Sequence, residues 1–211
     1  MSSFHDSFEQ DHDHPKWYHS QAVRPVLIGA SVKCCIWGNG QIFAEGNREL
    51  DELVRVTAYC DTDRGFGSVQ ENCWNYIKAN IEQIETELRR KIWAICRENF
   101  EEFLENVEAD NPEWLELKYL AKWEDPSSLD VQIELTEIGL FDHGFDEVGF
   151  CTFDFDVGWD EEHGLSILMH KGHVLAASSG ADFTGRGSSL IGHAKCIQKF
   201  DFTDGDLRID G

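Results

Sequence analysis

A long apolar stripe constrains the fold of this 211-residue chain more than any other feature of the sequence. From Trp74 to Ile95, large apolar residues recur at steps of three and four, which is the spacing of an amphipathic helix. The stripe continues to Val107, and Asn111-Pro112 ends it. About 40 helical residues would measure ~60 Å, whereas a compact chain of this size has a radius of gyration of ~17 Å. The sequence therefore predicts one long helix with a bend near Arg89–Arg97.

The start of this helix is marked by Ser68 and Glu71, which have the spacing of a capping box. The stripe itself has two interpretations. In the first, the helix covers one face of a sheet in the same chain. In the second, two copies of the chain pack their stripes together as a coiled-coil homodimer. We adopt the first interpretation and keep the homodimer as the alternative.

The second half of the chain has the pattern of an antiparallel sheet. Leu129–Leu135 and Cys151–Trp159 alternate apolar with polar side chains, as strands with one buried face do. Leu165–His170 and His173–Ala177 are joined by Lys171-Gly172, which suits a two-residue hairpin turn. The predicted fold class is therefore α+β. It consists of an antiparallel meander of about four strands packed against one long, bent amphipathic helix.

The first half of the chain adds shorter strands and a tail. β-branched and aromatic residues cluster in Val32–Trp37, Gln41–Ala44 and Leu53–Tyr59, and Asn39-Gly40 between the first two runs is a hairpin signal. Residues 1–20 are rich in histidine and aspartate, which is typical of a flexible N-terminal tail. The predicted organisation is a tail over residues 1–20 and a single α+β domain over residues 21–211.

The negative charge is concentrated in one part of the chain. The formal net charge is −22, and the window from Glu101 to Glu162 holds 20 acidic and two basic residues, which is −18 of that total. A field of this sign repels nucleic acid and attracts a basic protein surface. No run of residues reaches the ~18 apolar positions of a membrane span. The sequence thus favours a basic protein partner and argues against nucleic acid and membranes as partners.

Cysteine usage indicates the compartment. The seven cysteines are an odd number and show no C-x-x-C spacing, which indicates free thiols in a reducing cytoplasm rather than a zinc site. The N-terminus has no apolar segment of the kind found in signal peptides. We therefore expect a cytoplasmic protein.

The alternating strands place carboxylates on their polar faces. If the two strands are neighbours, Asp130 and Glu134 gather with Asp154 and Asp156 on one side of the sheet. Like charges in this arrangement cost stability, so the face predicts a cation or a basic partner. Three residues at the end of the second strand complete the candidate binding set, and they are Trp159, Asp160 and Glu162.

Histidines support a competing interpretation. His170 and His173 flank the predicted hairpin turn and should face each other across it, close enough to share a metal ion. His163, with Asp160 and Glu162 just before it, supplies further ligands. The alternative function is therefore a metal-dependent enzyme with a histidine and carboxylate site on the sheet. No P-loop, dinucleotide fingerprint or nucleophile motif occurs in the sequence, so no catalytic residue and no cofactor are assigned.

One run in this region resembles a family signature. The run W-D-E-E-H-G-L-S-I-L, followed by a K-G turn and H-V-L, resembles that of uncharacterised bacterial domain families, approximately Trp-Asp-x-Glu-His-Gly-Leu before a strand. The resemblance covers Phe150–Ala181, and Ser166 departs from it where a smaller residue is frequent. Such families are similar to immunity or accessory proteins encoded near bacterial toxins, which implies a binding role. The leading hypothesis is an immunity-type module that presents an acidic surface to a basic partner.

Overall fold

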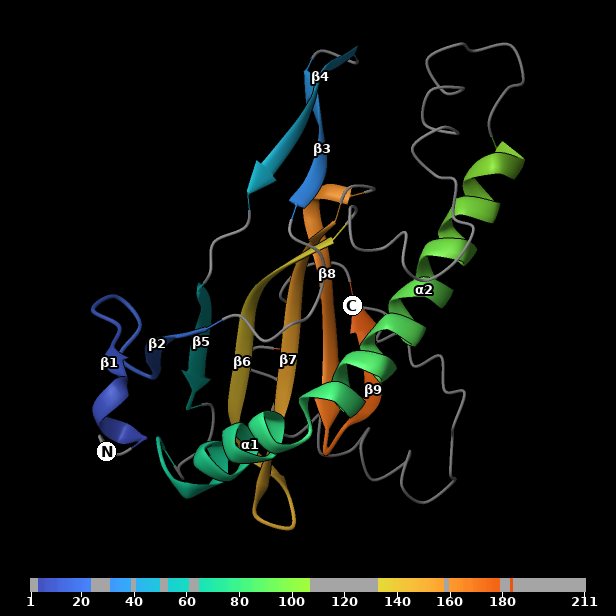
Figure 1. Cartoon of the computed structure of the whole chain (residues 1–211). Helices are drawn as coiled ribbons and strands as arrows, with labels where there is room; N and C mark the ends of the chain where they lie inside the picture. Colours follow the sequence, from blue (N-terminus) through green and yellow to red (C-terminus); the bar gives the residue numbers. More distant parts are fainter. Residues whose placement is uncertain are drawn as a thin grey trace.

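The computed structural model describes most of the chain, namely residues 4–23, 31–38, 41–49, 53–60, 65–106, 133–157, 160–178 and 183. Within these residues a seven-stranded mixed sheet forms the centre of the molecule, and two α-helices lie on one side of it (Figure 1). In chain order the elements are η1 (His5–Ser7), β1 (Glu9–Gln10), β2 (Trp17–Val23), β3 (Ser31–Gly38), β4 (Gln41–Glu49), β5 (Leu53–Tyr59), α1 (Ser68–Ala79), α2 (Ile81–Asn106), β6 (Ile133–Phe145), β7 (Val148–Val157), β8 (Asp160–His170) and β9 (His173–Ser178).

The large sheet has the strand order β1-β2-β5-β6-β7-β8-β9. β5 and β6 run parallel, and each of the other neighbouring pairs in this sheet is antiparallel. A parallel pair cannot be joined by a tight turn, so the chain between β5 and β6 makes a long crossover connection. Both α1 and α2 lie in this connection. β3 and β4 pair only with each other and form a separate two-stranded sheet within the described residues.

The predicted fold class is wrong in two respects. The sheet is mixed rather than antiparallel, because β6 pairs in parallel with β5 and in antiparallel fashion with β7. Two separate helices, α1 and α2, stand in place of one long helix bent near Arg89–Arg97. Periodicity in the sequence indicates which side of an element is buried, but it does not indicate which strands pair or in which direction.

The break between the two helices falls at Asn80. The Asn80 N–H points to the carbonyl oxygens of Tyr76 and Ile77, at 3.0 and 3.2 Å, and its side-chain amide donates to the Tyr76 oxygen at 2.9 Å. Asparagine side chains that bond to the nearby backbone compete with the regular helical bonds. The Ile84 N–H then donates to the Asn80 oxygen at 3.0 Å, so α2 begins directly after the break.

α1 begins where the sequence predicted a helix, but its capping differs. Gly67 is the N-cap rather than Ser68, and its N–H donates to Gln70 Oε1 at 2.9 Å. This bond is the second half of a capping box shifted by one residue. In the described part of the chain, neither helix has the length and apolar character that a membrane crossing needs.

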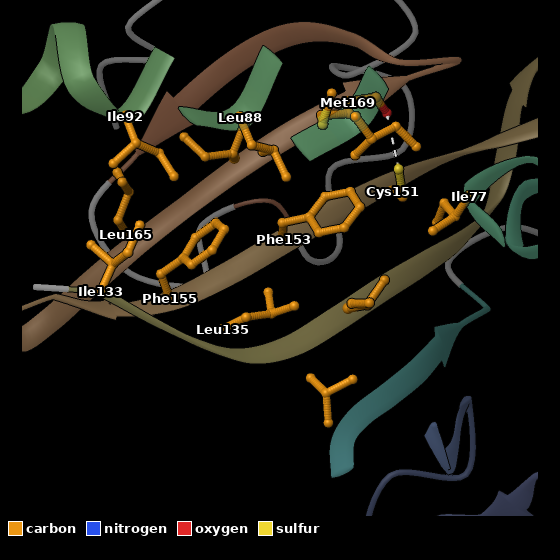
Figure 2. Close-up of a cluster of buried hydrophobic side chains, with 14 of the residues drawn as sticks. Ile77, Leu88, Ile92, Ile133, Leu135, Cys151, Phe153, Phe155, Leu165 and Met169 are labelled. Carbon is orange, nitrogen blue, oxygen red and sulfur yellow. Dashed lines mark hydrogen bonds between the residues drawn. The ribbon is translucent and has the colours of Figure 1, made fainter. Parts of the chain in front are cut away.

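The main core lies between the helices and one face of the sheet. Figure 2 shows Ile77, Leu88 and Ile92 from the helices lying over Phe153 and Phe155 of β7, and all five are almost fully buried. Each such side chain contributes ~1.5–3 kcal/mol when it is removed from water. This face of the sheet is therefore closed by packing. A smaller apolar cluster includes Phe141, Phe150 and Leu168 and packs on the opposite face.

The N-terminal segment takes part in the sheet. β2 pairs with β5 from Trp17 to Val23, although residues up to 20 were expected to form a tail. The rings of Phe4 and Phe8 lie 5.5 and 5.2 Å from the ring of Phe66, measured between centroids. Described residues of this segment thus pack against Phe66 and pair with β5. The division of the chain into residues 1–20 and 21–211 stays a prediction.

Candidate binding face

A row of polar residues crosses the sheet on the face opposite the helices, and we call it the polar row. Each member is the register partner of the next, from β2 through β5, β6, β7 and β8 to β9. Directly opposed residues share a face of a sheet, and chain neighbours such as Val54, Phe153 and Ile167 lie in the main core on the other face. The members are Gln21, Arg55, Glu137, Asp154, Ser166 and Ser178.

Glu137 lies on β6, the central strand of the seven-stranded sheet, and is held by two residues of β5. The Tyr59 hydroxyl donates to Glu137 Oε1 at 2.6 Å, and Arg55 Nη1 lies 3.9 Å from Oε2. Gly139 leaves room for the tyrosine ring, since a Cβ at that position would lie 2.9 Å from Tyr59 Cε2. Burial, and then the charge of Glu137, raise the pKa of Tyr59 well above its ordinary value. Tyr59 therefore remains a hydrogen-bond donor.

Asp154 faces Glu137 from the neighbouring strand β7. Both of its carboxylate oxygens accept hydroxyl groups, Oδ2 from Thr152 at 3.1 Å and Oδ1 from Ser166. Burial, together with the charge of Glu137, raises the pKa of Asp154 to about 6. The hydrogen bonds from Ser166 and Thr152 lower the pKa and offset part of this rise. Asp154 therefore changes its charge on the acid side of neutral pH.

The structure assembles part of the predicted acidic face. Glu134 and Asp156 are register partners on β6 and β7, so the two strands are neighbours, as the prediction required. Asp156 is exposed, but Glu134 is only 4 % exposed. Asp130 and Trp159 lie outside the described residues. The structure thus describes two opposed carboxylate pairs on this face. One is Glu134 with Asp156, and the other is Glu137 with Asp154.

The sequence analysis missed Glu137 because of an irregularity in β6. Strict alternation up to Leu135 places odd-numbered residues on the buried face, and the predicted strand ended there. In the structure the register shifts between Leu135 and Glu137, so that Ile138 enters the core and Glu137 takes the polar face. The Thr136 hydroxyl lies at this shift and donates to the Asp154 carbonyl oxygen at 3.0 Å. A bulge of this kind reverses the side-chain alternation without a clear sequence signal.

A second polar chain lies beside the row, between β2 and β5. His19 Nδ1 lies 2.9 Å from Thr57 Oγ1, and His19 Nε2 lies 2.8 Å from Asp11 Oδ2. The backbone N–H of His14, and next the His19 side chain, lower the pKa of Asp11 to about 2. Asp11 is therefore an anion that fixes the orientation of His19, and the other ring nitrogen of His19 contacts Thr57 of β5. Because Thr57 is fully buried, this arrangement holds the strands together and does not present a nucleophile.

Only two members of the predicted histidine site, His170 and His173, have side chains that the structure describes. His170 and His173 are register partners across the β8–β9 hairpin, as predicted. However, His170 is buried and its Nε2 lies 3.2 Å from the carbonyl oxygens of both Phe145 and Val148, whereas His173 is exposed. Among the side chains that the structure describes, no three candidate ligands come together to hold a metal ion. The remaining predicted members have side chains outside the described part, and they are Asp160, Glu162 and His163.

The fold places this chain in the class of mixed-sheet domains, with two helices on one face of the sheet and the polar row on the other. The chain matches the family model of DUF6985, a domain of unknown function, over residues 33–183, and it therefore belongs to this family. No curated protein and no solved structure matches the chain. The matched range contains every member of the polar row except Gln21. Membership of an uncharacterised domain family, predicted from the sequence, is confirmed.

Proposed function

We propose that this chain is a protein-binding module of the immunity type, and that its polar row receives a cationic side chain from a basic partner. The observation that carries the proposal is the direct register of Glu137 with Asp154. Two carboxylates that face each other across neighbouring strands repel each other when both are ionised. A guanidinium or ammonium group between them would remove this repulsion and make charge-assisted hydrogen bonds with both.

The two carboxyl groups are already oriented for such a ligand. Hydroxyl groups of Tyr59, Thr152 and Ser166 donate to them and fix their rotamers. Groups fixed before binding lose little conformational freedom on binding, which favours affinity. Glu137 is 20 % exposed at its side chain, so a partner side chain can reach it.

The charge of the whole chain supports a partner of opposite sign. With a formal net charge of −22, the molecule attracts basic surfaces from a distance and accelerates their encounter. Asp156, which is exposed and follows Asp154 on the same face, adds a rim charge to the row. We assign to these carboxylates the role of selecting a basic partner.

The proposal is tested with an oligo-arginine peptide whose binding is measured by fluorescence anisotropy at about pH 7.5. The double variant Glu137→Gln with Asp154→Asn should bind ~10-fold or more weakly, because it removes the charges that face the ligand. The matched control is Glu82→Gln with Glu98→Gln, which removes the same charge from exposed positions on α2 and should change the affinity less than ~3-fold. An equal loss in both variants would mean that net charge alone attracts the peptide, and would overturn the proposal.

A further inference from the structure

We propose that Glu137 and Asp154 act as one proton-binding pair, which holds a proton in the free protein at mildly acidic pH and releases it when a cationic side chain binds. The release half rests on the proposed function, because it requires a cation at the polar row. The holding half stands on the geometry of the free protein. The consequence is that binding of a basic partner strengthens as the pH rises toward neutral.

The pair is built by strand register and by hydroxyl groups. β6 and β7 set Glu137 opposite Asp154, and the irregularity at Thr136 brings Glu137 to this face. The Tyr59 hydroxyl donates to one carboxyl group and the Ser166 hydroxyl to the other. Turning either carboxyl group away would break a partly buried hydrogen bond. The two like charges therefore stay face to face, and uptake of one proton removes their repulsion.

The charged groups around the pair do not neutralise its negative charge. From β5, Arg55 approaches the nearer carboxylate at 3.9 Å, but its side chain is 59 % exposed, so water screens its charge. Tyr59, also on β5, remains protonated and neutral. On β6 and β7, Glu134 and Asp156 follow on the same face and add negative charge. From β8 the pair meets a serine hydroxyl, which does not titrate, while the side chains of 160–163 lie outside the described part.

The titration of Asp154 agrees with this geometry. Its pKa is raised to about 6 by burial, with Glu137 contributing. A group with this pKa is ionised in only about one tenth of the molecules at about pH 5 and in nearly all of them at about pH 7.5. If the ligand binds the ionised pair, its apparent affinity falls in proportion to that fraction. Binding should therefore be about 10-fold weaker at about pH 5 than at about pH 7.5.

The holding half is tested on the free, full-length chain by ¹³C NMR titration of aspartate carboxyl groups, with the Asp154 signal assigned from an Asp154→Asn variant. We expect a midpoint for Asp154 close to 6 and a lower midpoint in Glu137→Gln. A midpoint at the ordinary value of ~3.9 would overturn the proposal. A raised midpoint that does not move in Glu137→Gln would also overturn it, because Asp154 would then titrate alone.

The release half is tested with the oligo-arginine peptide, whose guanidinium groups do not titrate in this range. Wild type should lose about 10-fold in affinity between about pH 7.5 and about pH 5, and Asp154→Asn should lose much less. The variant keeps all nine histidines, so it corrects for their protonation. An equal loss in both proteins would overturn the release half. If the peptide binds at neither pH, the proposed function fails together with the release half, while the NMR titration still decides the holding half.

Discussion

At the scale of single residues, the closest donors to the central carboxyl pair are neutral hydroxyl groups, while the largely exposed Arg55 lies farther away, 3.9 Å from Glu137 Oε2. Ser166 and Thr152 are buried and donate their hydroxyl groups to Asp154, and Tyr59 does the same for Glu137. A hydroxyl donor fixes the orientation of a carboxyl group but does not supply a compensating charge. The position of Asp154 is therefore well defined while its protonation state responds to pH.

Replacing Asp154 by Asn should stabilise the fold at about pH 7.5 by about 1–3 kcal/mol and change little at about pH 3.5. The folded protein has a pKa of about 6 at Asp154, whereas the unfolded chain has the ordinary value of ~3.9. Between these values the folded state binds more protons than the unfolded state, so its stability falls as the pH rises. Asparagine carries no charge to bury and removes this loss.

Urea unfolding of both proteins at the two pH values measures this effect. The difference in the free energy of unfolding should grow as the pH rises from the lower value and level off above about pH 7. A difference that is the same at both pH values would show that Asn acts by packing and not by removing a titrating charge.

At the scale of elements, α1 holds two hairpin turns at one end of the sheet. The turns are Asp146-Glu147 between β6 and β7 and Lys171-Gly172 between β8 and β9, and all four residues have positive φ. Asn72 donates to a carbonyl of the first turn at 2.9 Å, and Tyr76 donates to a carbonyl of the second at 3.0 Å. The helix is thus fixed to both hairpins by its polar side chains as well as by the core.

These two turns show how far the sequence could predict the elements. Lys171-Gly172 was predicted, because a glycine between two alternating runs is a strong turn signal. The turn at Asp146-Glu147 was not predicted, because neither residue is a glycine and only these two residues separate the long strands β6 and β7. The parallel pairing of β5 with β6 was also missed, since residues 55–59 and 137–141 are far apart in the chain. Alternation holds up to Leu135 and along β7, so Glu134 and Asp156 lie on neighbouring strands, as the predicted acidic face required.

The contact of α2 with the sheet is tested by Leu88→Ala. Leu88 is 0 % exposed in the main core, so the substitution should lower the free energy of unfolding by about 2–5 kcal/mol in urea denaturation (Figure 2). The control Gln83→Ala, at an exposed position of the same helix, should change it by less than about 0.5 kcal/mol. A loss that grows on dilution of the protein would contradict packing within one chain and favour the helix-mediated homodimer.

At the scale of the whole molecule, the two faces of the sheet serve different purposes. The helices and β5 to β9 close one face with the main core. The opposite face carries an apolar cluster around Phe141 and Phe150 and, beside it, the polar row. The apolar cluster stabilises this face, while the row leaves charged groups in reach of solvent. The chain has a formal net charge of −22, so salt should act on folding and on binding through the same screening.

Added NaCl should therefore have opposite effects on stability and on affinity. Self-repulsion within a chain of formal charge −22 destabilises the compact state, and salt screens it, so the melting temperature should rise by about 2–6 °C between about 20 and 300 mM NaCl. Over the same range the oligo-arginine peptide should bind more weakly, because screening reduces its attraction to the row. Calorimetry and fluorescence anisotropy on one preparation measure both effects, and KCl should reproduce them. A melting temperature that falls with salt would mean that ion pairs such as Arg89 with Glu85 outweigh the self-repulsion of the acidic chain.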